Sequence, residues 1–120
     1  MVVVDLALAT ICFLGQCHPA LVGDDTPTGV FTLQLQATAA AGYGGDLLVF
    51  QEDRHSVWAI HRVIAGRPGE RRLERLRSGR PEQRRGITLG CINVMPQVYR
   101  ELVRCCDGDA LVVQGAPGDR

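Results

Sequence analysis

Short apolar runs separated by turn residues recur along the whole chain, and this pattern limits what the chain can fold into. Runs rich in β-branched and apolar residues include Val2–Leu6, Thr10–Leu14, Leu47–Phe50, Ser56–His61 and Ala110–Val113. Several short strands with frequent turns are typical of sheets packed face to face. The pattern therefore predicts a mainly β chain, a β-sandwich or barrel, rather than strands that alternate with helices.

The stretch from Val30 to Gln36 shows the clearest alternation of polar and apolar residues. Phe31, Leu33 and Leu35 fall on one side of it, which predicts a half-buried strand. The segment 38–45 that follows consists mainly of small residues. It is expected to be a plain connector or a loop that overhangs a cleft.

Two segments are predicted to be short helices. Residues 68–78 place Leu73 and Leu76 three positions apart, with charged residues around them. Residues 95–104 have a proline in the first turn and an apolar face made of Val98, Tyr99, Leu102 and Val103. The expected fold is therefore a β-sandwich-like domain with one or two short helices.

Length and composition predict a single domain. The chain has 120 residues, 46% of them hydrophobic, and a formal net charge of zero, so it can bury one core. Residues 1–120 are expected to form one domain, with 115–120 as a flexible tail. The apolar start, Met1–Leu14, contains Asp5 and lacks a basic region before it, so it is expected to be strand rather than signal peptide or membrane span.

The first and last cysteine pairs lead to different expectations. Cys12 and Cys17 flank a predicted two-residue turn, where a cross-strand disulfide and two reduced thiols both remain open. Cys105 and Cys106 are adjacent in the chain, and no bridge is expected between them. Neither a Cys-x-x-Cys nor a His-x-x-x-His pattern occurs, so no metal and no other cofactor is expected.

The remaining cysteine, Cys91, lies in the segment Gly86–Val94, between a glycine and an apolar pair. A glycine before a nucleophile lets the backbone turn sharply, and the N–H groups of Gly90 and Cys91 can then point at a developing oxyanion. A small buried cysteine without a chemical role fits the same segment. Cys91 is therefore a candidate nucleophile, with a structural role as the alternative.

Three motifs resemble segments of the L,D-transpeptidases, bacterial cysteine enzymes that remodel peptidoglycan, and they occur in the family's order. Thr26–Phe31 is similar to the Thr-Pro-x-Gly-x-Phe segment before a core strand, and Ala59–His61 to the strand that carries the catalytic histidine. Thr88–Cys91 is similar to the Ser/Thr-x-Gly-Cys active-site motif. The resemblance spans roughly Val2 to Gln114, and three motifs in order are more specific than any one.

The chain departs from the family pattern at two positions and in one spacing. Leu89 stands where the family often has a second histidine, and Asn93 where it often has an arginine. The separation between His61 and Cys91 is long for the family, so a segment must loop out between them. We expect 66–81 to form a helical or looped flap that carries arginines toward the cleft.

The resemblance implies a catalytic site made of Cys91, His61 and Gly90. His55 would point to the same face of the strand as His61, but it lies in a charged turn, so His61 is the expected general base. Without the resemblance, a purely structural role for His61 is equally plausible. Cys91 and His61 are expected to share a hydrogen bond, directly or through one water, on a cleft between strands. A catalytic Cys91 should also be alkylated fastest near neutral pH.

Charge is unevenly distributed although the total is zero. The chain up to Asp53 has six acidic and no basic residues, whereas Arg62–Arg85 has nine arginines and three glutamates. This basic segment lacks an aromatic stacking residue, which argues against nucleic acid as the partner. Peptidoglycan stems carry carboxylates, so the expected substrate-binding residues are Arg84 and Arg85, as a bidentate clamp, with Thr88, Arg62 and Asn93.

The implied function is cleavage of the L,D bond of a tetrapeptide stem through a Cys91 thioester, followed by transfer of the acyl group to an amine. Water as the acceptor gives an L,D-carboxypeptidase instead. An antibacterial effector with the same chemistry, opposed by an immunity protein, is a further alternative. A non-catalytic peptidoglycan-binding or interaction domain is the alternative of another class. The family implies the periplasm or cell wall, reached by another route or through a signal outside this sequence.

Overall fold

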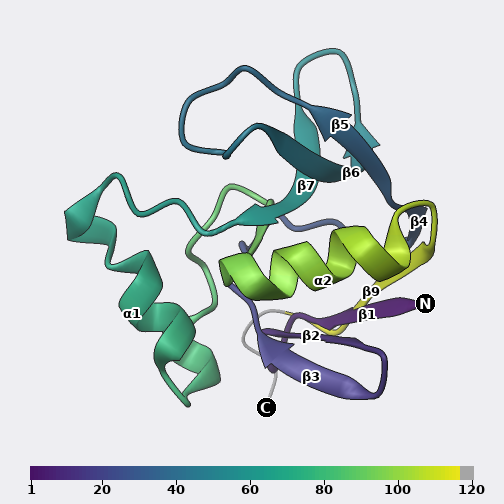
Figure 1. Ribbon diagram of the computed structural model, residues 1–120. Helices are drawn as coiled ribbons and strands as arrows, with labels where there is room; N and C mark the ends of the chain where they lie inside the picture. Colours follow the sequence, from purple (N-terminus) through teal and green to yellow (C-terminus); the bar gives the residue numbers. More distant parts are fainter. Residues whose placement is uncertain (117–120) are drawn as a thin grey trace.

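The computed structural model describes residues 1–116 and contains two β-sheets (Figure 1). The five-stranded sheet has the strand order β3-β2-β1-β9-β4. Its strands are β1 (Val2–Asp5), β2 (Thr10–Phe13), β3 (Gln16–Pro19), β4 (Gly29–Thr32) and β9 (Ala110–Gln114). β1 and β9 are parallel, and the other neighbours are antiparallel.

The second sheet has four strands in the order β5-β6-β7-β8. They are β5 (Gln34–Ala37), β6 (Asp46–Glu52), β7 (Val57–Arg62) and β8 (Ile92–Val94). β7 and β8 are parallel neighbours, so the chain between them must cross over. That crossover holds the 3₁₀ turns η1 (Pro68–Glu70) and η2 (Pro81–Gln83) and the helix α1 (Arg72–Arg77).

One hydrophobic core joins both sheets to the helix α2 (Pro96–Cys106), which lies between them in Figure 1. The fully buried side chains of this core come from both sheets and from α2, and include Val4, Ile11, Ile60, Ile92 and Leu102. The mainly β fold with short helices is therefore confirmed. Each sheet nevertheless contains one parallel pair, which a purely antiparallel sandwich lacks.

The alternating stretch 30–36 forms two strands. β4 and β5 belong to different sheets, and the fully buried Leu33 lies between them. The Leu33 N–H donates to the Asp109 carbonyl, and its own carbonyl accepts from the Gly108 N–H. The chain thus changes sheets without losing its backbone hydrogen bonds. The predicted apolar face does not continue across the break, because Leu35 in β5 is 38% exposed whereas Leu33 is fully buried.

The predicted helix over 68–78 is also interrupted. Arg71 has a φ of 52°, a left-handed conformation that ends η1 before α1 begins. The second predicted helix is confirmed as α2 and continues two residues further, to Cys106. Gly115 and Ala116 of the predicted tail follow β9, whereas 117–120 lie outside the described residues.

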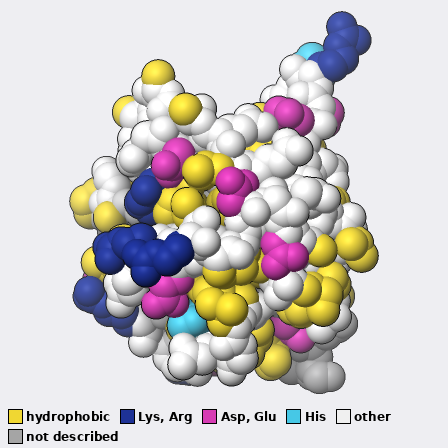
Figure 2. Space-filling model, turned by 45° about the vertical axis from the view of Figure 1, so that its right-hand side comes forward, with side chains coloured by type: hydrophobic (Ala, Val, Ile, Leu, Met, Phe, Trp, Pro, Cys, Tyr) yellow, Lys and Arg dark blue, Asp and Glu magenta, His cyan; other side chains and the backbone are white. Residues whose placement is uncertain are grey.

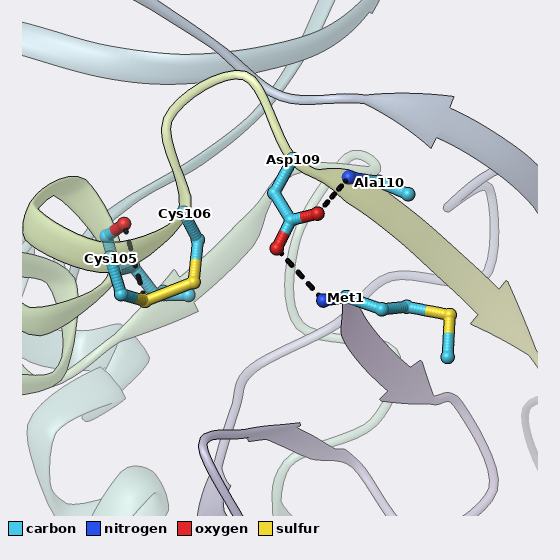
Figure 3. Close-up of a disulfide and its surroundings, with 6 residues drawn as sticks. Met1, Cys105, Cys106, Asp109 and Ala110 are labelled. Carbon is cyan, nitrogen blue, oxygen red and sulfur yellow. Dashed lines mark hydrogen bonds and ion pairs between the residues drawn. A yellow bond between two sulfur atoms is a disulfide. The ribbon is translucent and has the colours of Figure 1, made fainter.

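Both terminal cysteine pairs are bridged. Cys12 and Cys17 are direct cross-strand partners in the β2–β3 hairpin, and a disulfide joins them. Cys105 and Cys106 also form a disulfide at the end of α2, so the expectation of two unbridged thiols was wrong (Figure 3). Just beyond it, Asp109 binds the amino terminus of Met1 at 2.8 Å, which ties the start of β1 to the turn before β9.

The surface carries the uneven charge that the sequence indicated. On the face in Figure 2, most of the visible basic side chains gather toward the left edge, with acidic ones beside them. Within residues 1–116, no helix has the length and apolar character needed to cross a membrane.

Candidate functional site

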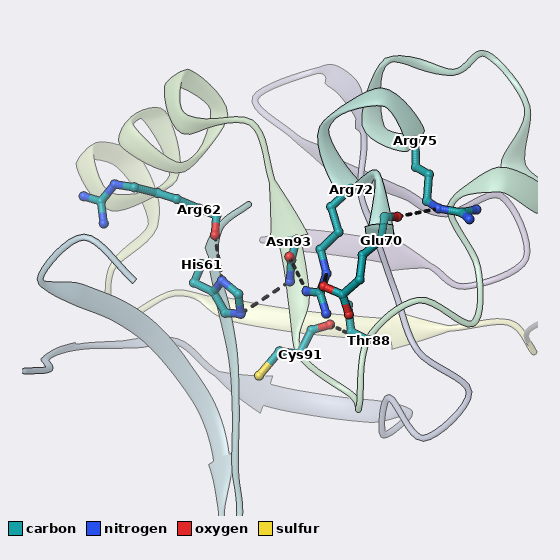
Figure 4. A network of polar contacts seen from close by, with 8 residues as sticks. All are labelled: His61, Arg62, Glu70, Arg72, Arg75, Thr88, Cys91 and Asn93. Carbon is teal, nitrogen blue, oxygen red and sulfur yellow. Dashed lines mark hydrogen bonds and ion pairs between the residues drawn. The ribbon is translucent and has the colours of Figure 1, made fainter. Parts of the chain in front are cut away.

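The parallel pairing of β7 and β8 brings the site together. His61 is the direct register partner of Asn93. Cys91 lies two residues before Asn93, so strand alternation puts it on the same side of the sheet. Figure 4 shows Cys91, His61 and Asn93 close together. Two segments about thirty residues apart in sequence thus supply one cluster, as expected.

The turn before Cys91 is built around Thr88. Its hydroxyl donates to the Cys91 carbonyl at 2.6 Å and accepts from the Gly90 N–H at 3.1 Å. Gly90 has a φ of 128°, and a Cβ there would lie 2.7 Å from Nε1 of Trp58. Both the backbone conformation and the available space therefore require glycine at this position.

This turn changes the expected oxyanion site. The Gly90 N–H is already bonded to Thr88, so it does not point at a developing oxyanion. Within the described residues, the Cys91 N–H has no acceptor. Thr88 therefore shapes the turn before Cys91, and the Cys91 N–H is the available backbone donor.

The segment 21–26 supports the turn from behind. Leu21 and Asn93 exchange two backbone hydrogen bonds, of 2.9 and 3.0 Å. Gly23 passes so close that a Cβ on it would lie 2.2 Å from the Thr88 carbonyl oxygen. Thr26, the first residue of the Thr-Pro-x-Gly motif, accepts the Gly23 N–H at 3.0 Å. The motif thus holds the backbone against which the cysteine turn packs.

Hydrogen bonds determine which tautomer His61 adopts. Its Nδ1 lies 2.7 Å from the Arg62 carbonyl oxygen, which can only accept, so Nδ1 carries the proton. Nε2 then holds the lone pair and faces Nδ2 of Asn93 at 3.3 Å. The acceptor that orients His61 is therefore the backbone of the next residue.

The amide of Asn93 is itself oriented. Nη1 of Arg72 donates to Oδ1 of Asn93 at 2.9 Å, which leaves Nδ2 to face His61. Arg72 is the first residue of α1, so the inserted segment contacts Asn93, the residue beside His61 (Figure 4). The chain Arg72–Asn93–His61–Arg62 is thus a continuous polar network.

Cys91 and His61 are both neutral at rest. Burial raises the pKa of the Cys91 thiol above its ordinary value, although the Ala59 N–H and the Arg72 charge oppose this. Burial also lowers the pKa of His61; the Arg62 carbonyl opposes this shift and the Arg72 charge adds to it. A resting thiolate–imidazolium pair is therefore disfavoured.

The expected hydrogen bond between Cys91 and His61 is absent from the described residues. The Cys91 thiol donates instead to the Val57 carbonyl, with Sγ at 3.7 Å from the oxygen. Both side chains nevertheless line one solvent-open cavity of about 650 Å³. The shared cleft is confirmed, whereas the shared hydrogen bond requires the thiol to turn.

Two loops complete the walls of the cavity. The 38–45 loop contributes Tyr43, whose ring meets His61 edge-on at 4.8 Å between centroids. The inserted segment contributes Arg67, Glu70 and Arg72. Of the two roles left open for the 38–45 loop, the structure shows the overhanging loop rather than the plain connector, and it confirms the flap that carries arginines to the cleft. His55, the histidine not chosen, lies exposed in the β6–β7 turn.

The expected arginine clamp lies elsewhere. Arg84 is 4% exposed and donates to the carbonyls of Ala9, Leu8 and Ser78. Arg85 donates to the Ala7 carbonyl at 2.8 Å. Neither lines the cavity. Arg84 connects Ser78 of the inserted segment to the β1–β2 turn, and Arg85 contacts the same turn, so the structure does not bring the expected clamp to the cleft.

Arg62 does not face the cavity either. Its side chain points away from the site in Figure 4, pairs with Asp46 at 3.0 Å and stacks 4.3 Å from the Tyr99 ring centroid. It acts through its backbone carbonyl. Arg72 was not singled out from the sequence, since nothing distinguishes it locally from the other arginines of the segment.

Similarity to known proteins is visible in structure and not in sequence. No family model matches the sequence, and no curated protein does. A crystal structure of an L,D-transpeptidase from Stackebrandtia nassauensis has a TM-score of 0.57 at 18% identity and covers 98% of this chain. An L,D-transpeptidase from Xylanimonas cellulosilytica has a TM-score of 0.60 at 13% identity over 94% of this chain. The structure of the LD transpeptidase LdtMt1 in complex with imipenem has a TM-score of 0.56 at 13% identity and covers 94% of this chain.

The chain therefore has the L,D-transpeptidase fold. It spans 56%, 59% and 58% of the length of these three chains, respectively. At these identities the similarity establishes the architecture alone.

Proposed function

We propose that this protein is a cysteine acyltransferase that cleaves the L,D bond of a peptidoglycan tetrapeptide stem and transfers the acyl group to an amine. The observation that carries the proposal is the free thiol of Cys91 on the same cavity wall as His61, whose Nε2 holds a lone pair. The shared fold with L,D-transpeptidases supports this chemistry over other cysteine reactions.

In the proposed first step, His61 Nε2 takes the thiol proton as Sγ of Cys91 attacks the carbonyl carbon between the L-centre of diaminopimelate and the terminal D-residue. A C–S bond forms, and the Cys91 N–H donates to the oxyanion. The C–N bond then breaks as His61 returns the proton to the leaving amine. A D-amino acid departs, and a thioester remains on Cys91.

In the second step, an amine of another stem attacks the thioester and loses a proton to His61. A C–N bond forms, the C–S bond breaks, and the sulfur regains the proton from His61. Water as the acceptor would give an L,D-carboxypeptidase with the same residues. Before the first step, the thiol must leave the Val57 carbonyl and turn toward His61. His61 Nε2 must at the same time give up its contact with the Asn93 amide and accept the thiol proton instead.

The test is to incubate the protein with tetrapeptide-stem muropeptides and follow the products by mass spectrometry. A cross-linked dimer together with released D-amino acid supports transpeptidation, and D-amino acid alone supports carboxypeptidation. Cys91→Ser should give neither, because an alkoxide is far harder to form than a thiolate. The same products from wild type and Cys91→Ser would overturn the enzyme hypothesis. Imipenem, which LdtMt1 binds, is a second probe; a stable adduct on Cys91 is expected.

A peptidoglycan-binding module without turnover is the second candidate. It is favoured by the neutral resting thiol and by Leu89, which is 96% exposed at the cavity edge. Stem binding that is equal in wild type and Cys91→Ser, without product from either, would select this candidate. Both candidates place the protein at the cell wall or in the periplasm with stem peptides as partners, and an effector role with an immunity protein is compatible with the first.

A further inference from the structure

Arg72 is the arginine of the inserted segment that reaches the site. Its side chain is 15% exposed, with Nη1 on Asn93 at 2.9 Å and Nε on Glu70 at 3.2 Å. A guanidinium has five N–H donors, so roughly three remain beyond these two bonds. Arg72 also lines the cavity that Cys91 and His61 share. It therefore presents free donors next to the nucleophile.

The charge of the cavity favours an anion. Its charged lining residues are Arg67, Arg72 and Glu70, and the lowered pKa of His61 keeps that residue neutral. One positive charge is thus left uncompensated.

We infer that Arg72 binds a carboxylate of the ligand that lies beside Cys91, so that the site prefers an acid to the matching amide. The inference deepens the proposed function and rests on it for the natural ligand, which is then a stem with a free carboxylate near the scissile bond rather than an amidated stem. Because the same guanidinium orients Asn93, carboxylate binding is coupled to the group that faces His61.

Two alkylating agents test the inference without peptidoglycan. Iodoacetate and iodoacetamide react alike: the Cys91 thiolate attacks the CH₂ carbon, a C–S bond forms, and iodide leaves. They differ only in that iodoacetate carries a carboxylate where iodoacetamide carries an amide. Both need the same thiolate, so the ratio of their rates cancels any change in the thiol pKa. The other four cysteines are in disulfides and do not compete.

The iodoacetate-to-iodoacetamide ratio should fall about three- to tenfold in Arg72→Gln. Arg77→Gln is the matched control, because Arg77 is on the same helix and exposed outside the cavity; it should keep the wild-type ratio. An unchanged ratio in Arg72→Gln, or an equal fall in both variants, would overturn the inference. Circular dichroism and thermal unfolding establish that each variant folds.

Arg72→Lys provides a second variant if Arg72→Gln does not fold. Lysine keeps the charge but loses the planar fork of donors, so its ratio should lie between those of wild type and Arg72→Gln. A full wild-type ratio in Arg72→Lys would also count against the inference. An acid preference without stem turnover would reject the proposed function and retain this inference, and turnover without an acid preference would do the reverse.

Discussion

At the residue scale, the neutral thiol and neutral imidazole determine how the site responds to pH. The pKa of Cys91 lies above its ordinary value of 9.0 and that of His61 below 6.5, chiefly because His61 is buried and Cys91 half-buried, which disfavours the charged form of each. The thiolate fraction of the free protein is therefore small at neutral pH. This replaces the expectation that alkylation is fastest near neutral pH.

We predict that iodoacetamide alkylates Cys91 at a rate that is still rising at pH 9, because deprotonation of the thiol limits the reaction. Rates between pH 6 and 10, followed by mass spectrometry of the Cys91 peptide, measure this. A rate that levels off near pH 7 would show a preformed thiolate.

Turnover should retain its rate down to a pH below 6.5, since His61 stays neutral there.

His61→Ala is predicted to lower the rate of D-amino acid release by roughly 10²- to 10⁴-fold, the usual range for a lost general base. His55→Ala is the matched control, because His55 lies exposed in the β6–β7 turn. Release rates from a tetrapeptide stem compare the two variants. Equal losses in both would remove His61 from the mechanism.

At the element scale, the turn between Thr88 and β8 sets the position of Cys91. Gly90 needs both its positive φ and the space that the Trp58 indole leaves. Gly45 has a similar φ of 104° but open space around it, which separates the two requirements.

Gly90→Ala is therefore predicted to destabilise the protein by about 2–4 kcal/mol, because strain and a steric clash add. Gly45→Ala should destabilise the protein by about 1 kcal/mol, because only backbone strain acts there. Urea unfolding of both variants measures the difference, and Cys91 alkylation reports whether the turn has moved. Equal destabilisation would mean that the indole moves aside at little cost.

At the scale of the whole molecule, the two disulfides should contribute unequally to stability. The Cys12–Cys17 bridge joins residues five positions apart. It lowers the entropy of the unfolded chain and thereby stabilises the folded state by roughly 2 kcal/mol. The Cys105–Cys106 bridge joins neighbours, so it closes almost no loop and should contribute little by this mechanism.

Replacing Cys12 and Cys17 together by serine is predicted to lower the free energy of unfolding by about 2 kcal/mol. In a domain of this size, that loss lowers the thermal midpoint by several degrees. The Cys105→Ser, Cys106→Ser double variant should change it by less. Calorimetry of both double variants checks the order. A larger loss from the vicinal pair would mean that its contribution comes from packing of the buried Cys106.

Local pattern was sufficient for much of the fold and for the identity of the candidate pair. Strand periodicity located β1, β2, β6, β7 and β9, and apolar spacing located α2. The order of three motifs pointed to the L,D-transpeptidase fold and singled out Cys91 and His61. These features are encoded by residues close in sequence, where side-chain period and turn chemistry act directly.

Tertiary structure alone decided where the long side chains go. Arg84 and Arg85 turn inward to backbone carbonyls, whereas Arg72 reaches Asn93 and the cavity, although all three lie in one basic segment. An arginine side chain spans several ångströms and takes the acceptors that the packed chain leaves within reach, so its direction is not set by its sequence neighbours. The pKa shifts of the Cys91 thiol and the His61 imidazole have the same origin, since the burial that causes them exists only once the chain has folded.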